Sequence, residues 1–111
     1  MPRDYKVYVE DILESIEKVQ EYTRGLTLPE FVQDRLVFDA TLRNLAIIGE
    51  AARSIPELIK KKHPEIEWRK IVEFRNIVIH EYFEMDHEII WDVIQNKLPT
   101  LKLQIEKIHA S

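Results

Sequence analysis

The 111-residue chain predicts an all-α fold, an antiparallel bundle of four to five helices joined by short loops. It contains only two glycines, although sheets and nucleotide-binding turns of the Rossmann type depend on glycine. Apolar residues recur at spacings of three and four along most of the chain, which is the period of amphipathic helices. The length suits one domain, residues 1–111, that is large enough to bury its own core.

The first helix is expected from Asp4 to Tyr22. Its apolar stripe consists of Tyr5, Val9, Ile12, Ile16 and Val19. These residues follow one another at spacings of four, three, four and three, so they share one helix face. Gly25 comes just after the expected end and suits a left-handed helix cap.

The second helix is expected from Thr27 to about Arg53. Thr27 and Glu30 form a capping box, and proline is tolerated in the first turn that follows. The apolar face is broad, which indicates contacts on more than one side. Its residues are Phe31, Leu36, Phe38, Leu42, Leu45, Ile47, Ile48, Ala51 and Ala52.

Three residues interrupt this face, and one of them is a glycine. Gly49 costs up to about 1 kcal/mol relative to alanine inside a helix. We attribute it to the close approach of another backbone. Asn44 and Glu50 are candidates for buried polar groups that orient a neighbouring arginine.

Three further helices are expected. Ser54 and Glu57 predict a second capping box before a short helix that reaches Lys62 and stops at His63-Pro64. A central helix is expected over residues 68–83. The last helix should begin after an Asp86 cap and be kinked or split near Pro99, because proline removes an amide donor and clashes with the preceding turn. Its stripe is Ile89, Ile90, Val93, Ile94, Leu98, Leu101, Ile105 and Ile108.

Composition narrows the functional classes. The chain has no cysteine, no segment resembling a signal peptide and no apolar run of the ~20 residues that a membrane span needs, so we expect a cytoplasmic protein without membrane contact. A net charge of −4 argues against a broad electrostatic grip on nucleic acid. Residues 60–75 nevertheless carry six bases and three acids. The candidate RNA contacts are Lys60, Lys61, Lys62, Arg69 and Lys70; the alternative is a solvated basic face.

A polar cluster lies in the central helix. Arg75, Asn76, His80 and Tyr82 fall within eight residues of a largely apolar segment, and such groups are costly to bury without partners. They therefore either satisfy one another or face a site. Asn76 and His80 are four residues apart and share a helix face.

Phosphodiester cleavage in RNA suits this set of side chains. A base must take the proton of the 2′-hydroxyl, an acid must protonate the leaving 5′-oxygen, and a cation must offset phosphoryl charge. Histidine titrates near neutrality and serves as acid or base, and arginine offers a bidentate fork. A symmetric dimer would supply a second histidine, so that the two roles can be divided. The candidate catalytic residues are Arg75, His80 and Asn76.

The alternatives are structural. A single histidine near a helix end is commonly a satisfied structural residue, and Arg75 alone suits an ion pair with an acid such as Glu50. His63, His87 and His109 share no metal-like spacing, so no metal site and no cofactor are expected.

Residues 75–82, R-N-I-V-I-H-E-Y, resemble the R-N-x-x-x-H-x-Y signature of HepT-like HEPN-domain toxins. The resemblance extends to Trp68, to I-G-E-A-A at residues 48–52, to Tyr82-Phe83 and to Trp91, and so covers nearly the whole chain. One departure is Glu73-Phe74 before the arginine, where many relatives have glycine. An acid there affects substrate contacts and removes no catalytic group.

The resemblance implies both an activity and its control. HEPN domains are helical bundles that dimerise with their motifs facing each other, and family members act as metal-independent ribonucleases. HepT toxins are silenced by an MntA-like nucleotidyltransferase antitoxin that transfers AMP from ATP to the motif tyrosine, here Tyr82. We therefore expect a homodimeric endoribonuclease toxin that cleaves RNA, with tRNA as a candidate substrate. The alternative is a non-catalytic module that binds a nucleotide or the nucleotidyltransferase.

Overall fold

The fold is all-α, as the sequence predicts. A computed structural model describes residues 4–80 and 86–110, and every regular element within these ranges is helical. The elements are α1 (Tyr5–Thr23), α2 (Leu28–Gln33), α3 (Arg35–Ser54), α4 (Glu57–Lys62), α5 (Trp68–His80), α6 (His87–Asp92), the π-helical segment η1 (Val93–Lys97) and α7 (Leu98–Ala110).

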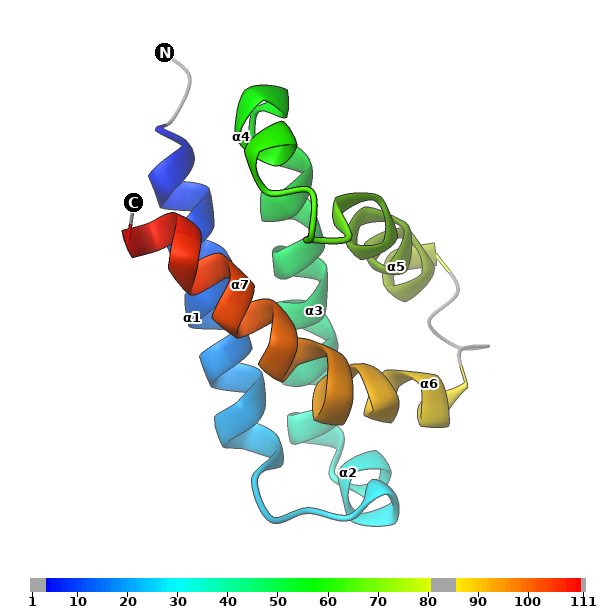
Figure 1. Ribbon diagram of the computed structural model, residues 1–111. Coiled ribbons are helices and arrows are strands. Elements are labelled where there is room, and N and C mark those ends of the chain that lie inside the picture. The colour runs from blue at the N-terminus through cyan, green and yellow to red at the C-terminus, as the bar shows by residue number, and fades with distance from the viewer. Residues whose placement is uncertain (1–3, 81–85, 111) are drawn as a thin grey trace.

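Helix α3 lies at the centre of the bundle. It runs antiparallel to α1, and α5 packs against another part of its surface, while α7 packs on α1 (Figure 1). The contacts on more than one side expected for this part of the chain are therefore confirmed, although Leu36 and Ile47 of the expected face are exposed. The most deeply buried side chains of the core are Val9, Ile12, Ile16, Val19, Phe31, Ala52, Ile90, Ile105 and Ile108.

The start and end of α1 follow the sequence signals. The side chain of Asp4 accepts a hydrogen bond from the backbone N–H of Lys6 at 3.0 Å. Gly25 has φ +78°, the left-handed conformation that glycine adopts without a steric penalty. The Thr27 and Glu30 capping box before α2 is also formed, with both reciprocal bonds present.

The single helix expected from Thr27 to Arg53 is wrong, because the chain breaks at Asp34. This residue is extended, with φ −85° and ψ 95°. Its carboxylate accepts from the backbone N–H of Val37 at 3.1 Å, and its own N–H donates to the carbonyl of Glu30. An aspartate can thus end α2 and cap α3 at once, a local competition with helix that is typical of this residue.

The second capping box is also wrong. Ser54 is the last residue of α3, and its hydroxyl donates to the carbonyl of Glu50 at 3.2 Å instead of capping α4. Pro56 occupies the cap position of α4 and makes no side-chain bond there. The short helix itself ends at Lys62 as expected.

The disruption expected near Pro99 is confirmed, and it takes the form of a π-helical segment. In η1 the backbone N–H of Leu98 donates to the carbonyl of Val93, five residues earlier. This wider turn lies directly before the proline, whose ring would clash with the carbonyl of an ordinary α-helical turn. Asp86 caps α6 through the N–H of Glu88, also as predicted.

Helices α3 and α5 meet at Gly49, which is buried. A Cβ atom added there would overlap Cβ of Arg75 and lie 2.6 Å from its Cγ and 3.3 Å from its Cα. The clash involves the root of the arginine and its backbone, which cannot move without moving α5. The glycine therefore allows the close approach of the two helices, as the sequence predicts.

Gly49→Ala is expected to destabilise the protein by roughly 1–3 kcal/mol, the usual cost of overpacking a core. In an uncrowded helix the same change would stabilise by up to about 1 kcal/mol, so the sign of the effect identifies the close contact. Chemical denaturation of both proteins measures it. A variant as stable as the original or more stable would contradict this account of the crossing.

Candidate active site

Arg75 is anchored at the crossing of α5 and α3. Its side chain is only 21% exposed. Its Nη2 atom lies 2.6 Å from Oε2 of Glu50, and its Nη1 atom donates to Oδ1 of Asn76 at 2.9 Å. Nε is buried and has no partner among the described residues.

These contacts fix the direction of the guanidinium without exhausting its donors. Arginine carries five N–H groups in a planar fork, and Glu50 and Asn76 engage two of its nitrogens. Glu50 is 54% exposed, so solvent screens the ion pair and limits its stabilising effect to about 1 kcal/mol or less. The pair therefore orients the arginine more than it stabilises the fold.

Of the two residues predicted to orient Arg75, the structure brings one to it and not the other. The structure brings Glu50 to Arg75, although the carboxylate is half-exposed rather than buried as expected. Asn44 is buried, but its amide donates to the carbonyl of Ala40 at 2.9 Å, one turn earlier in α3. Within the described chain, Asn44 makes no hydrogen bond to Arg75.

The remaining motif residues are placed only in part. Asn76 is exposed, and its side-chain oxygen accepts from Arg75. His80 is the last residue of α5, one helical turn beyond Asn76 along the backbone. Its side chain lies outside the described part of the structure, as does Tyr82 and the expected helix end at Phe83.

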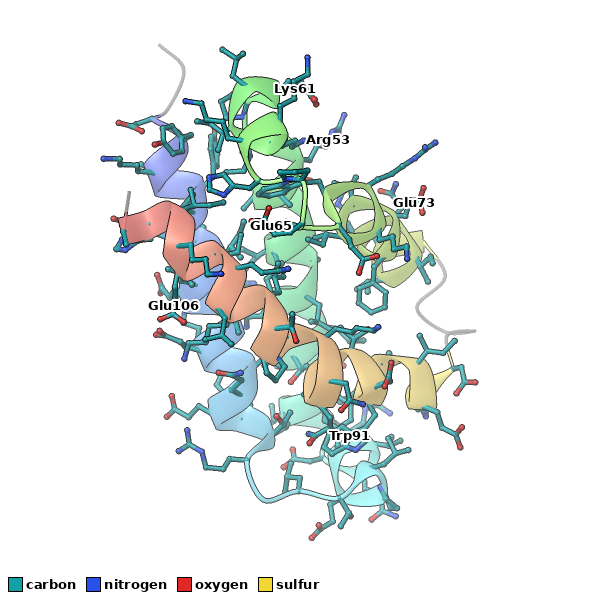
Figure 2. The ribbon with its side chains drawn as sticks, viewed as in Figure 1. Arg53, Lys61, Glu65, Glu73, Trp91 and Glu106 are labelled. Atoms are coloured by element: carbon teal, nitrogen blue, oxygen red, sulfur yellow. The ribbon has the colours of Figure 1, made fainter. Side chains whose placement is uncertain are left out.

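The five bases predicted to contact RNA lie in three different places. Lys60, Lys61 and Arg69 line a cavity of about 660 Å³ between the end of α3, α4 and the start of α5. Arg53, which the sequence analysis did not single out, lines the same cavity (Figure 2). No spacing in the sequence pointed to Arg53, because it joins these bases only where α4 folds back beside the end of α3.

Lys70 points to a different part of the surface. It lines a more apolar cleft of about 410 Å³ between α5, η1 and α7, and its ammonium lies 2.7 Å from Glu67. This hydrogen-bonded pair lowers the pKa of the Glu67 carboxyl and raises the pKa of the Lys70 amine. Lys62 lines neither space and is exposed at the end of α4.

Arg75 and its partners Glu50 and Asn76 form an arginine clamp. The side of α3 that carries Glu50 also exposes two apolar side chains. Leu36 is 85% and Ile47 37% exposed. With Arg43 and Glu50 they recur at spacings of seven, four and three residues, which places them on one side of the helix. The exposed strip of Leu36 and Ile47, with Arg43 between them, therefore lies on the side of α3 that carries the carboxylate holding Arg75.

The described ranges, 4–80 and 86–110, contain no group of three or more histidine, aspartate or glutamate side chains arranged to hold a metal ion. They also contain no helix of the length and hydropathy needed to cross a bilayer.

Comparison with known proteins places the chain in a family. The family model described as "Ribonuclease HepT-like" matches residues 12–108. A Thermococcus cleftensis protein named "Probable ribonuclease HepT" is 41% identical over 98% of this chain and 99% of its own length. A Methanocaldococcus jannaschii protein described as a "Putative RNase" is 37% identical over 97% of this chain and 90% of its own length.

A third relative, a "Putative RNase" of Caldanaerobacter subterraneus subsp. tengcongensis, is 37% identical over 91% of this chain and 90% of its own length. No solved structure matches significantly. The family model and these relatives each cover most of the chain, including the α3–α5 crossing and the helix that carries Arg75. The chain therefore belongs to the HepT-like ribonuclease family.

Proposed function

We propose that this protein is a ribonuclease toxin, a homodimer that cleaves RNA without a metal ion at a site shared between its two copies. The observation that carries the proposal is the arginine clamp. Arg75 of α5 is oriented by Glu50 of α3 and by its neighbour Asn76, and it lies one to two turns before His80. The chain that carries this arrangement belongs to the HepT-like ribonuclease family. tRNA is a suitable first substrate to test.

Arg75 stabilises the charge that develops on the phosphoryl oxygens. The N–H groups of the guanidinium that do not contact Glu50 or Asn76 suit a bidentate contact with a phosphate. Because the guanidinium is already directed by its partners, little of its freedom is lost when the transition state forms. Asn76 serves as the positioning partner of Arg75.

His80 serves as the general acid or general base. One copy of the chain provides one such histidine, whereas the reaction needs a base at the 2′-hydroxyl and an acid at the 5′-oxygen. A twofold axis near the ends of two α5 helices supplies both. The exposed strip of Leu36 and Ile47, which shares one side of α3 with Glu50, supports this side as the dimer face, since solvent-exposed leucine and isoleucine favour burial against a partner.

Control by an antitoxin belongs to the same proposal. A nucleotidyltransferase of the MntA type transfers AMP from ATP to the hydroxyl of Tyr82, and pyrophosphate leaves. Tyr82 follows His80 by two residues and Arg75 by seven. An added adenylate carries a negative phosphate that competes with the RNA phosphate for Arg75.

His80→Ala is expected to slow RNA cleavage by roughly 10²–10⁴-fold, the usual contribution of general acid–base catalysis. The substrate is a labelled tRNA mixture in EDTA, and intact mass first confirms that Tyr82 is unmodified. The original protein should leave 2′,3′-cyclic phosphate ends, because the 2′-oxygen attacks the adjacent phosphorus.

The variant must keep its dimeric mass and melting temperature for this result to identify a catalytic role. An unfolded His80→Ala protein would show a structural histidine and remove the support for the mechanism. No cleavage of a broad RNA panel by the unmodified, dimeric original protein would favour the alternative, a module that binds a nucleotide or the nucleotidyltransferase.

Tyr82→Phe is expected to prevent modification by the partner nucleotidyltransferase. With ATP and that enzyme, the original chain should gain one adenylate in intact-mass spectrometry, whereas the variant lacks the acceptor hydroxyl and should gain none. Tyr22→Phe, a change at a tyrosine of α1, is the matched control and should still be modified. Equal modification of Tyr82→Phe would locate the acceptor elsewhere.

A further inference from the structure

We propose that the cavity between α3, α4 and α5 binds backbone phosphates of RNA beside the scissile phosphate, with Arg53 and Lys61 as its principal contacts. The inference rests on the proposed ribonuclease function and adds a substrate-binding subsite to it. Three features of the structure support it: the shape and lining of the cavity, the pairing of its charges, and its position relative to Arg75.

The cavity is an open depression of the surface with an apolar wall and a rim of charged side chains. Trp68 and Val72 of α5 form the wall, and Trp68 is held in place because its indole N–H donates to the carbonyl of His63 at 3.1 Å. Four cations and two carboxylates complete the lining, on a chain whose net charge is −4. Its open shape leaves room for an extended strand rather than an enclosed small molecule.

Two of the four cations already have partners. Lys60 lies 3.8 Å from the Glu57 carboxylate, and its ammonium donates to the carbonyl of Arg53 at 3.5 Å, at the end of α3. Arg69 lies 3.4 Å from Glu73, one turn further along α5. Both carboxylates of the lining are thereby paired within the cavity.

Arg53 and Lys61 are the two cations of the lining that are not paired with its carboxylates. Both are exposed, and neither forms an ion pair with a side chain in the described ranges. Figure 2 shows them at the same end of the molecule, on α3 and α4, with Glu73 on α5 across from them. Two unpaired positive charges from different helices at one opening provide a local site for phosphate, which the acidic remainder of the surface does not.

The cavity adjoins the arginine clamp. Arg53 lies three residues after Glu50 on α3, and Val72 lies three residues before Arg75 on α5, so both walls continue to the clamp within about one turn, ~5 Å. An RNA strand whose scissile phosphate is at Arg75 can therefore place a neighbouring phosphate between Arg53 and Lys61. This subsite serves binding, whereas Arg75 serves the chemical step.

The test is the salt dependence of binding to 2′-O-methyl RNA, which lacks the attacking hydroxyl. The double variant Arg53→Gln/Lys61→Gln is compared with Arg24→Gln/Lys6→Gln, which removes one arginine and one lysine from exposed positions of α1 and its cap, outside the cavity. Each phosphate contact contributes about −0.7 to the slope of log affinity against log salt for single strands. The cavity variant should therefore lose about 1.4 in slope and about tenfold in affinity near physiological salt, and the comparison variant should keep both.

The outcomes separate this subsite from the proposed function. Equal losses in the two double variants, or no loss in the cavity variant, would overturn the subsite, even if the original protein cleaves RNA. A loss confined to the cavity variant would establish it, even if cleavage is absent and the ribonuclease proposal fails. Lys61→Gln alone provides a milder variant, with half the slope change, and thermal melting confirms that each protein is folded.

Discussion

The contact between α3 and α5 at Gly49 is the constraint on which the site depends. A hydrogen at this position lets the root of Arg75 lie against the α3 backbone, and any Cβ would push the two helices apart. The crossing places Glu50, the next residue of α3, within 2.6 Å of the guanidinium. The position of the arginine therefore follows from backbone packing. The half-exposed ion pair with Glu50 orients the guanidinium and contributes little to the stability of the fold.

The proposed binding subsite and the proposed chemical step lie on opposite sides of this crossing. Toward the start of α5 and the end of α3 lies the cavity with Arg53 and Lys61, and toward the end of α5 lies His80. In the proposed homodimer, the second copy would supply the second α5 end. In this arrangement the acidic net charge is no obstacle, because the positive charge needed for phosphate is concentrated at the crossing and its cavity.

Local signals in the sequence predicted much of this structure. The spacing of apolar residues predicted the helices, and Gly25 and Asp86 predicted the end of α1 and the start of α6. Gly49 was correctly predicted to be a point of close approach between helices. The break at Asp34 was missed, because an aspartate inside an amphipathic pattern ends a helix only when its neighbours' amides become available to it. Arg53 was missed because its importance depends on how α4 folds back beside α3, a tertiary arrangement that no spacing in the sequence encodes.

The most direct test of the central claim is the effect of Arg75→Lys on RNA cleavage, with Arg24→Lys as the matched control on α1's exposed cap. Lysine keeps the charge but lacks the planar fork that Glu50 and Asn76 orient. We expect kcat to fall by about 10²–10³, as when one transition-state donor is lost, with RNA affinity nearly unchanged. A variant whose kcat equals that of the original protein and of Arg24→Lys would contradict the claim that the oriented guanidinium acts on the scissile phosphate.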